Sequence, residues 1–363
     1  MGTVHERLTR AYTGKRVLVT GHTGFKGSWL VLWLKELGAE ITGYALDPQT
    51  SRDNFVLSGA GQGINDVRGD VRDETKTADV VGSAYPEIVF HLAAQSQVLE
   101  GYLQAKETYD VNVGGTVNIL EACRKCGSVK AIIVVTSDKC YENRELLRGY
   151  HEGDRLGGFD PYSSSKACQE MVAAAYRNAF FSGEGSAAVA LSTVRAGNVI
   201  GGGDWSEHRL IPDCVRALEA GVPIKIRAPE HKRPWQYVLE PLGGYLVLAE
   251  KMASEPRAYS EAWNFGPSAT ATKPVKELVR LMIKAWGSGT WETVTAASPL
   301  HEARLLALNI RKARARLPWR PAYGLSEAVR RTMRWYKRGI DRADMSAFCR
   351  DEILAYMKRM PVS

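Results

Sequence analysis

The chain has 363 residues, of which 45% are hydrophobic and 24% are charged, and its formal net charge at pH 7 is +8. This composition is ordinary for a globular protein that buries a large core in two domains, or in one domain with a lobe. No segment is long and apolar enough for a membrane span, so we expect a soluble cytoplasmic protein without a membrane partner. The positive charge forms no arginine stripe interleaved with aromatic residues, which argues against a nucleic-acid partner and favours an anionic small substrate. The six cysteines form no framework, and we expect neither disulfides nor a bound metal.

The first predicted strand, residues 17–19, leads through a glycine turn into an apolar helix. Strand, glycine turn and helix are the start of a dinucleotide site in a βαβ unit. There Gly21 permits the tight turn, Gly24 lets the backbone approach a pyrophosphate, and Gly27 lets helix and strand pack closely. The pyrophosphate would lie at the helix N-terminus, where free N–H groups favour an anion. The spacing is GxxGxxG, not GxGxxG, so an ordinary glycine-rich turn is the alternative.

A second predicted strand, residues 41–46, ends in Asp47, twenty residues beyond Gly27. A carboxylate there is expected to accept hydrogen bonds from the adenosine ribose and to repel a 2′-phosphate, which favours NAD over NADP. Arg52 keeps NADP as a minor alternative. Asp70 follows the next strand-end pattern and either accepts from the adenine amino group or caps the following helix.

Three more predicted strands, residues 88–90, 131–135 and 187–194, continue the alternation with helices. A helix over about residues 108–126 carries Gly114 and Gly115, which cost stability in a helix and so imply a close packing partner or a close approach of the cofactor. The pattern predicts an α/β fold with a Rossmann-type, doubly wound parallel sheet and a smaller C-terminal mixed α/β substrate lobe. We place the NAD-binding Rossmann domain at residues 1–197, with a return segment near 232–265. The nucleotide-sugar-binding lobe is expected at residues 198–231 and 266–363.

Tyr162 and Lys166 are four residues apart and share one face of a predicted helix. An ammonium near a phenol lowers the pKa of the tyrosine, which makes it a base able to take a proton from a hydroxyl while hydride leaves the same carbon. Ser137, at the end of a neighbouring strand, is placed to hydrogen-bond that hydroxyl. The alternative for the tyrosine and lysine is an ordinary pair on a helix surface.

Several segments resemble the extended short-chain dehydrogenase/reductase family and, within it, the nucleotide-sugar 4,6-dehydratases. They include TGHTGFKG, HLAAQ, TSDKCYENRE, DPYSSSK, RAGNVIGGGDW and RPWQYVLEPLGGY, and they span about residues 15–266. The resemblance implies a tightly held NAD, a nucleotide-diphosphate sugar as substrate, and a homodimer or higher homo-oligomer. It implies a redox-neutral conversion of CDP-D-glucose to CDP-4-keto-6-deoxy-D-glucose, in which Tyr162, helped by Lys166 and Ser137, takes the proton of the carbon-4 hydroxyl.

The same resemblance assigns the elimination of water to two neighbouring residues. Asp138 is expected to protonate the departing carbon-6 hydroxyl. Lys139 stands where related dTDP-sugar dehydratases have a glutamate, and it is either the base at carbon 5 or an electrostatic stabiliser of the enolate. Leu99, beside Glu100, replaces an arginine that the family pattern has there, and Asn309 replaces an aspartate.

The candidate site therefore contains three groups of residues. The catalytic group is Ser137, Asp138, Lys139, Tyr162 and Lys166. The cofactor-binding group is Gly21, Thr23, Gly24, Phe25, Lys26, Gly27, Asp47, Asp70, Val71, Leu92, Ala93, Ala94 and Asn112. The substrate-binding group is Gln95, Asn198, Arg209, Arg233 and Arg304.

Three other functions fit parts of this pattern. The first is a 4,6-dehydratase of another nucleotide sugar. The second is a 4-epimerase on the same scaffold, which needs the tyrosine and lysine but has no use for an acid at position 138. The third is a non-catalytic NAD-binding regulator, for which a broken catalytic set would be expected.

Overall fold

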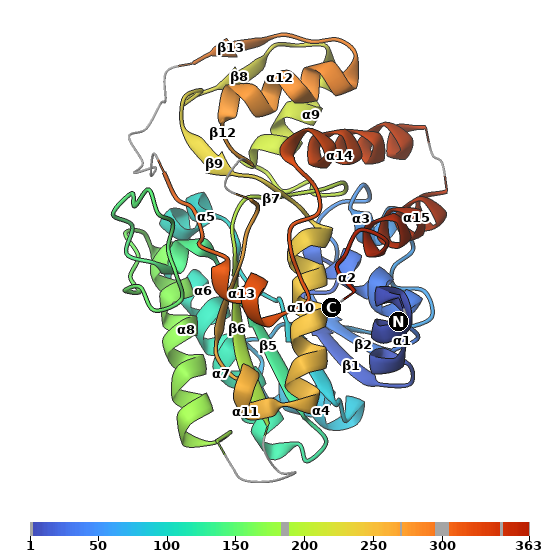
Figure 1. The fold of residues 1–363 in the computed structure, drawn as a ribbon, viewed down its shortest axis with the longest axis vertical. Coiled ribbons are helices and arrows are strands. Elements are labelled where there is room, and N and C mark those ends of the chain that lie inside the picture. Colours follow the sequence, from blue (N-terminus) through green and yellow to red (C-terminus); the bar gives the residue numbers. More distant parts are fainter. Residues whose placement is uncertain (1–2, 183–188, 269–270, 295–304, 342–343, 363) are drawn as a thin grey trace.

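A parallel sheet of seven strands runs through the chain in the order β11-β6-β5-β4-β1-β2-β3 (Figure 1). The computed structural model describes residues 3–182, 189–268, 271–294, 305–341 and 344–362. Most of these strands are short apolar runs buried on both faces, which is typical of a parallel sheet covered by helices. The strands are β1 (Arg16–Thr20), β2 (Glu40–Ala45), β3 (Asn65–Arg68), β4 (Ile88–His91), β5 (Ala131–Val135), β6 (Ala190–Ala196) and β11 (Ala262–Phe265).

The strand order reverses at β1, which pairs with β2 on one side and with β4 on the other. Val17 of β1 lies opposite both Ile41 and Ile88. In doubly wound sheets, ligands bind in the crevice beyond the carboxyl ends of the two strands where the order reverses. The predicted fold class is therefore confirmed, and the crevice begins where β1 ends at Thr20 and β4 ends at His91.

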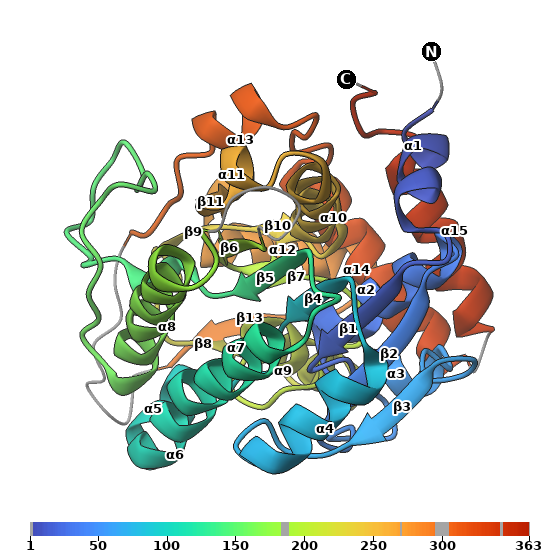
Figure 2. The same ribbon diagram turned by 90° about the horizontal axis from the view of Figure 1, so that it is seen from below.

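Helices cover both faces of the sheet (Figure 2). Val17 and Val19 belong to the core under α2 and α10, whereas Leu18 belongs to the core under α4, α7 and α8. Successive side chains of a strand point to opposite faces, so this short run serves both cores. The covering helices are α2 (Phe25–Glu36), α4 (Glu74–Ala84), α7 (Gly115–Lys125), α8 (Pro161–Ala179), α10 (Leu239–Ser254) and the C-terminal α15 (Met345–Met357).

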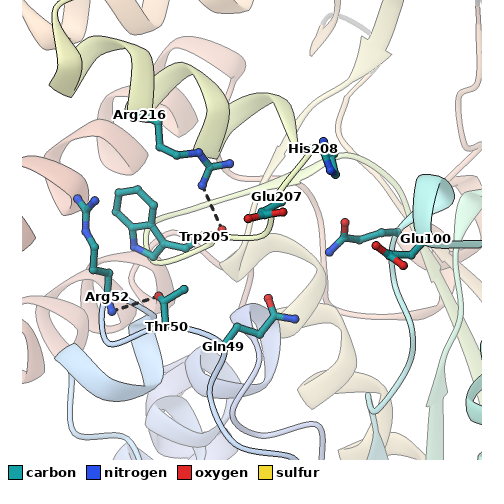
Figure 3. Close-up of a pocket in the computed structure, with 9 residues that line it drawn as sticks. Gln49, Thr50, Arg52, Glu100, Trp205, Glu207, His208 and Arg216 are labelled. Atoms are coloured by element: carbon teal, nitrogen blue, oxygen red, sulfur yellow. Dashed lines mark hydrogen bonds between the residues drawn. The ribbon is translucent and has the colours of Figure 1, made fainter. Parts of the chain in front are cut away.

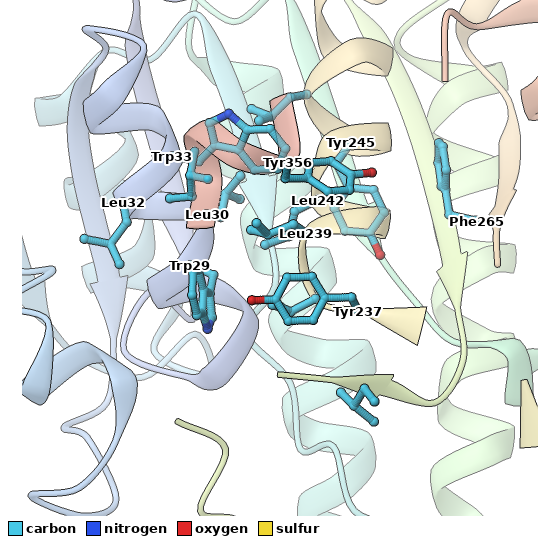
Figure 4. Packing of buried hydrophobic residues seen from close by; sticks show 14 of the residues in the cluster. Trp29, Leu30, Leu32, Trp33, Tyr237, Leu239, Leu242, Tyr245, Phe265 and Tyr356 are labelled. Atoms are coloured by element: carbon cyan, nitrogen blue, oxygen red, sulfur yellow. The ribbon is translucent and has the colours of Figure 1, made fainter. Parts of the chain in front are cut away.

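The helix α2, which follows the glycine turn, is apolar around its circumference and is buried over residues 27–34. Such a helix needs neighbours on every side. Figure 4 shows Trp29 and Trp33 of α2 among side chains of α10 and α15. The indole nitrogen of Trp29 donates to the carbonyl oxygen of Gly202 at 3.0 Å, and that of Trp33 lies 3.2 Å from the sulfur of Met357. Distant parts of the chain thus hold the helix in place.

A smaller group of elements lies at the top of Figure 1. In it β8 pairs with β13 in parallel and β9 pairs with β12 in antiparallel fashion, and α12 packs on α14. Its elements are α9 (Leu210–Ala220), β8 (Ile224–Ile226), β9 (Lys232–Pro234), β12 (Thr272–Pro274), α12 (Val275–Trp286), β13 (Trp291–Thr293) and α14 (Leu325–Ile340). The later elements α13 and α15 pack instead on β11 and α2 of the larger body. The domain boundary at residue 197 stays a prediction.

The remaining elements are short connections and edge elements. They are α1 (Val4–Tyr12), α3 (Asn54–Leu57), α5 (Val98–Leu103), α6 (Ala105–Tyr109), α11 (Pro256–Tyr259), α13 (Arg311–Arg316), and the parallel pair β7 (Val199–Ile200) and β10 (Gln236–Tyr237). Two further helical segments are a wide π-helix at Asp110–Gly114 and a tight 3-10 turn at Asp138–Cys140. No helix in the described part of the chain has both the length and the hydropathy that a bilayer crossing needs.

The helix expected over residues 108–126 is in fact three consecutive pieces. The π-helix separates α6 from α7 and contains Asn112. A Cβ on Gly115 would lie 2.6 Å from a methyl group of Val71, so this glycine has the close packing partner that its cost in a helix implied. A Cβ on Gly114 would meet no atom within 4 Å, so this glycine has no close packing partner among the described residues.

Replacement of Gly27 by alanine tests how tightly α2 sits on the turn. Its Cβ would lie 2.1 Å from the carbonyl oxygen of Gly21, so the helix must shift, and we expect the free energy of unfolding to fall by at least about 1–3 kcal/mol. Urea denaturation measures this change. The matched control is Gly82→Ala on the exposed side of α4, where a Cβ meets nothing within 4 Å and a gain of up to about 1 kcal/mol is expected. Equal effects of the two substitutions would contradict the close approach.

Candidate active site

The glycine turn brings the backbone of β1, α2 and β4 together at the crevice. Gly21 has a φ of +71°, and a Cβ there would lie 2.7 Å from the amide nitrogen of Ala93. Gly24 precedes the first turn of α2 and provides no side-chain cap, which leaves N–H groups of that turn available to a ligand. A bare, uncapped helix N-terminus beside a strand end is a favourable site for a phosphate group.

The end of β2 carries an exposed carboxylate. The side chain of Asp47 is 87% exposed, and its nearest described cation is Arg68, with a nitrogen–oxygen distance of 3.6 Å. Arg52 does not approach it, because its guanidinium lies 3.6 Å from the ring centre of Trp205 and pairs with Glu219 of α9. The arginine that kept NADP as an alternative thus points toward the smaller lobe.

Asp70 is engaged by a local arginine. Its carboxylate accepts hydrogen bonds from Nε and Nη2 of Arg72 at 2.9 and 2.6 Å. Burial alone would raise the pKa of the Asp70 carboxyl, but these hydrogen bonds lower it overall. The prediction that Asp70 caps the following helix is wrong, because Asp73 caps α4 by accepting from the amide of Lys76 at 2.9 Å. The adenine-binding role stays a prediction.

Other predicted cofactor residues line the same edge of the sheet. The hydroxyl of Thr23 donates to the carbonyl oxygen of Leu46 at 2.9 Å, which ties the glycine turn to the end of β2. Leu92 and Ala94 are half-buried just beyond β4, and Phe25 is half-buried at the start of α2. Leu92, Ala94 and Phe25 thus place apolar side chains beside the polar backbone groups of the glycine turn.

Asn112 carries a buried oxygen that the structure does not satisfy. Its amide nitrogen donates to the carbonyl oxygen of Gln95 at 3.0 Å and to Oγ of Ser165 at 2.9 Å. Its Oδ1 is buried and has no hydrogen-bond partner in the described part of the chain. Such an acceptor is costly unless a ligand supplies the donor. The side chain of Gln95 itself is used within its loop, since its oxygen accepts from the amide of Gln97 at 2.6 Å.

Asp138 lies at the centre of the site, directly after β5. Ser137 caps the 3-10 turn by accepting from the amide of Lys139 at 3.2 Å, and its hydroxyl lies 3.0 Å from Oδ1 of Asp138. The Asp138 side chain is only 1% exposed, and its Oδ2 has no partner among the described residues. A Cβ on Gly197 would lie 1.9 Å from that oxygen, so only glycine leaves room for it. Sequence reasoning missed Gly197, although a glycine directly after β6 was a usable signal.

Tyr162 is buried beside this carboxylate, and its pKa is raised. Burial is the largest cause, whereas Lys139, the hydroxyl of Ser137 and Arg209 lower the pKa. The prediction that Lys166 lowers the pKa of this phenol toward neutrality is therefore wrong for the protein alone. The Lys166 ammonium lies 6.0 Å from the ring centre, and burial, aided by Lys26, lowers its own pKa to about 7.

Four cationic side chains gather around Asp138 and Tyr162 and interact electrostatically with one or both of them or with each other. They are Lys26, Lys139, Lys166 and Arg209. Burial lowers the pKa of Lys26 to about 8, and Arg209 adds to this, while Asp138 opposes it. Lys26 was predicted as a cofactor residue through its place in the glycine turn, but its side chain belongs to this cluster. An excess of buried positive charge favours an anionic ligand.

The predicted substrate residues do not all converge on this cluster. Arg209, at the start of α9, donates to Asp204 at 3.0 Å and to the hydroxyl of Ser96 at 2.7 Å, so it bridges the two sides of the crevice. Asn198 follows β6 with a φ of +38°, and its carbonyl oxygen accepts from the amide of Gln236. Arg233 lies on β9 of the smaller lobe, where it donates to the carbonyl oxygen of Lys232. Arg304 lies outside the described residues.

A cavity of about 460 Å³ opens next to the bridge formed by Arg209 (Figure 3). Its lining mixes acidic, basic and amide side chains from two loops and from α5 and α9, and the Arg52 guanidinium stacks on Trp205 in its wall. The lining residues are Gln49, Thr50, Arg52, Gln97, Glu100, Trp205, Glu207, His208 and Arg216. Sequence reasoning singled out Arg52, Glu100 and the motif that ends at Trp205, but it missed residues 49–50 and 207–208, which carry no motif.

A buried ion pair supports the catalytic loop from behind. Glu170 of α8 accepts from Arg195 of β6 at 2.7 Å and from the hydroxyls of Thr136 and Thr193 at 2.5 and 2.6 Å. Arg195 in turn donates to the hydroxyl of Tyr141 at 2.6 Å. These contacts tie together the ends of β5 and β6, between which Asp138 and Gly197 meet, and they offset part of the cost of burying a charge pair.

Comparison with known proteins gives one consistent result. Residues 17–266 match the model of the NAD dependent epimerase/dehydratase family. The chain is 47% identical to CDP-glucose 4,6-dehydratase of Salmonella typhimurium over 95% of this chain and 97% of that protein. It is 28% identical to dTDP-glucose 4,6-dehydratase of Streptomyces griseus over 88% of this chain and 93% of that protein.

Solved structures share the fold. An epimerase of Methanothermobacter thermautotrophicus superposes with a TM-score of 0.80 at 23% identity, covering 93% of this chain and 97% of that one. The dTDP-glucose 4,6-dehydratase of Bacillus anthracis in complex with NAD gives a TM-score of 0.73 at 24% identity, covering 90% and 98%. With a crevice at the strand reversal, a glycine turn on α2 and matching relatives over most of its length, the chain belongs to the NAD dependent epimerase/dehydratase family.

Proposed function

We propose that the protein is a nucleotide-sugar 4,6-dehydratase that converts CDP-D-glucose to CDP-4-keto-6-deoxy-D-glucose. The observation that carries this proposal is the buried Asp138, whose unpartnered oxygen lies among the catalytic side chains of a site that already contains Tyr162 and Lys166. The 47% identity to CDP-glucose 4,6-dehydratase over nearly the whole chain supports CDP-D-glucose as the substrate.

The residues of the crevice fit the NAD on which the family depends. Gly21 and Gly27 leave no room for a Cβ but admit backbone, the first turn of α2 is uncapped, and Oδ1 of Asn112 awaits a donor. Asp47 suits the adenosine ribose because its exposed carboxylate can accept from hydroxyl groups. When bound, NAD accepts a hydride from carbon 4 of the sugar and returns a hydride to carbon 6, which makes the overall reaction redox-neutral.

Tyr162 takes the proton of the carbon-4 hydroxyl. It must first lose its own proton, which burial opposes and which Lys139, Ser137 and Arg209 favour. The cationic cluster is therefore part of what makes the phenol a base. The positively charged nicotinamide ring of a bound NAD would also lower the pKa of the phenol. Ser137 also offers its hydroxyl to the same sugar oxygen.

Asp138 completes the elimination. Once carbon 4 is a ketone, the hydrogen on carbon 5 is acidic and passes as a proton to solvent, the bond from carbon 6 to its hydroxyl breaks, and the protonated carboxyl of Asp138 supplies the proton that turns this hydroxyl into water. Lys139, with Nζ 3.7 Å from Asp138, stabilises the negative charge that develops on the ketone oxygen. A 4-epimerase has no step that uses an acid here, and a buried carboxylate without a role would only cost stability.

Lys26 and Arg209 are proposed to hold the diphosphate of the substrate, because the two cations interact electrostatically with each other and with Asp138 or Tyr162. We also propose a homodimer in the cytoplasm and keep the domain division at residue 197. Leu103, Met171 and Phe180 support the dimer, since they expose 64%, 55% and 54% of their surface on the neighbouring α5 and α8 regions.

Purified protein incubated with CDP-, dTDP-, GDP- and UDP-glucose is expected to form a 4-keto-6-deoxy product from CDP-glucose, detected by its alkali-induced absorbance. Asp138→Asn is expected to lower kcat by about 10²–10³-fold, because the acid is lost while its shape remains. The matched control is Asp79→Asn on the exposed face of α4, which should leave kcat unchanged. Formation of a 4-epimer alone, or an unchanged kcat in Asp138→Asn, would refute the dehydratase.

Lys139→Met is expected to move the acidic limb of the kcat profile upward by about one pH unit. Lys139 lowers the pKa of Tyr162, so its removal raises that pKa and a higher pH is needed to form the phenolate. The measurement is kcat between pH 5 and 9 with saturating CDP-glucose. If Lys139 is instead the base at carbon 5, the variant loses activity at every pH and the limb does not move.

Binding of CDP is expected to take up protons near pH 8. The pKa of Lys26 is lowered to about 8 in the free protein, and a bound diphosphate raises it, so protons are taken up where the free amine is partly neutral. Calorimetric titrations in two buffers of different ionisation enthalpy measure this uptake. In Lys26→Met the uptake near pH 8 should shrink, and an unchanged uptake would remove Lys26 from the diphosphate site.

A further inference from the structure

Lys166 is held by a neutral amide. Its Nζ donates to Oε1 of Gln169 at 2.7 Å, one turn further along α8, and both side chains are almost fully buried. The neighbouring carboxylate on the same helix, Glu170, pairs with Arg195 instead. A buried ammonium is costly, and its orientation depends on the acceptors that remain to it.

The hydrogen bonds continue from Gln169 into the sheet. Nε2 of Gln169 donates to Oγ1 of Thr116 at 2.6 Å, and Nε2 of His91 lies 3.0 Å from the same oxygen. Oγ1 of Thr116 also lies 2.7 Å from the carbonyl oxygen of Asn112 in the π-turn. The side chains of Gln169, Thr116 and His91 are at most 1% exposed, so water does not compete for these bonds.

The chemistry of the end groups fixes each proton on this path. An ammonium only donates, so the amide of Gln169 must turn its oxygen to Lys166 and its nitrogen to Thr116. A carbonyl only accepts, so the single hydroxyl proton of Thr116 goes to Asn112. Thr116 must therefore accept from both Gln169 and His91.

His91 is thereby fixed as the neutral tautomer with its proton on Nε2. Its Nδ1 then accepts from the hydroxyl of Thr20 at 2.7 Å, and Thr20 accepts from the amide of Ala93 at 3.1 Å. Burial, with a further contribution from Lys166, lowers the pKa of His91 to about 3, in agreement with a neutral ring. The hydrogen bonds of the path thus run from α8 through α7 and β4 to the end of β1.

We propose that Gln169 is a positioning residue, which holds the Lys166 ammonium through this path and, because it is neutral, leaves the charge of that ammonium uncompensated in the active site. A carboxylate at position 169 would orient the lysine equally well but would cancel its charge. An apolar side chain would leave the charge but remove the orientation. The proposal rests on the proposed function only in taking Lys166 as a catalytic residue.

The first test titrates Lys166 without any substrate. The full-length protein, as purified, is labelled briefly with acetic anhydride at a series of pH values, and mass spectrometry of the Lys166 peptide reports the fraction of neutral amine. Gln169→Glu is expected to raise the apparent pKa of Lys166 by about one to three units, because an opposite charge then lies at hydrogen-bond distance. Asn178→Asp, exposed at the far end of α8, adds the same charge on the same helix and should cause no shift.

The second test measures turnover of CDP-glucose. Gln169→Leu is expected to lower kcat by about tenfold or more with little change in KM, because the ammonium loses its acceptor. Thr116→Val breaks the path one bond further on and should lower kcat in the same sense, while Thr116→Ser restores the hydroxyl and should restore kcat. If a variant at position 169 does not fold, the comparison of Thr116→Val with Thr116→Ser still tests whether the path positions Lys166.

An unchanged Lys166 titration in Gln169→Glu would overturn the proposal, and so would equal kcat in the valine and serine variants at position 116. If the wild-type protein fails to turn over CDP-glucose, the proposed function falls, but the labelling experiment still decides the role of Gln169.

Discussion

The site depends on the gathering of four cations, one buried and three partly buried, around one carboxyl group. Charges taken out of water cost several kcal/mol each unless partners compensate them. Asp138 can compensate only a part of the charge that Lys26, Lys139, Lys166 and Arg209 bring. The pKa of Lys26 is lowered to about 8 and that of Lys166 to about 7, and Arg209 forms an ion pair with Asp204. A bound anionic ligand compensates the remaining positive charge. The excess charge that lowers the stability of the free protein therefore favours binding of a substrate with a diphosphate.

The ends of β5 and β6 hold Asp138 in position among these cations. Asp138 and Gly197 approach so closely that no side chain fits between them, and in the Glu170–Arg195 pair behind them both carboxylate oxygens of Glu170 accept hydrogen bonds. The Asp138 carboxyl is therefore shielded from water and lies among the cations. Its position is set by backbone and by a buried ion pair, not by the loop that follows, so the acid is already in place before the substrate arrives.

The sequence predicts those parts of this arrangement that are local. Short apolar strands, the glycine turn and the helix that carries Tyr162 follow from patterns within a few residues, and the Rossmann order follows from their alternation. The π-turn at 110–114 has no such signature, because a single i→i+5 turn leaves no period in the sequence. The direction of the pKa shift of Tyr162 also could not be predicted, since burial by distant segments outweighs its neighbour at i+4. Gly197 acquires its role only from the three-dimensional contact.

The segment in which the chain departs from the family pattern shows how the two sides of the crevice are joined. Leu99 is the second residue of the short helix α5, and Glu100 beside it lines the cavity. Three residues before Leu99, Ser96 accepts a hydrogen bond from Arg209, which comes from α9 across the crevice. Arg209 thus brings a cation from the smaller lobe to this loop, which has Leu99 where the family pattern has an arginine. Because Arg209 also lowers the pKa of Tyr162, the contact that joins α9 to the sheet side of the crevice contributes to the strength of the base.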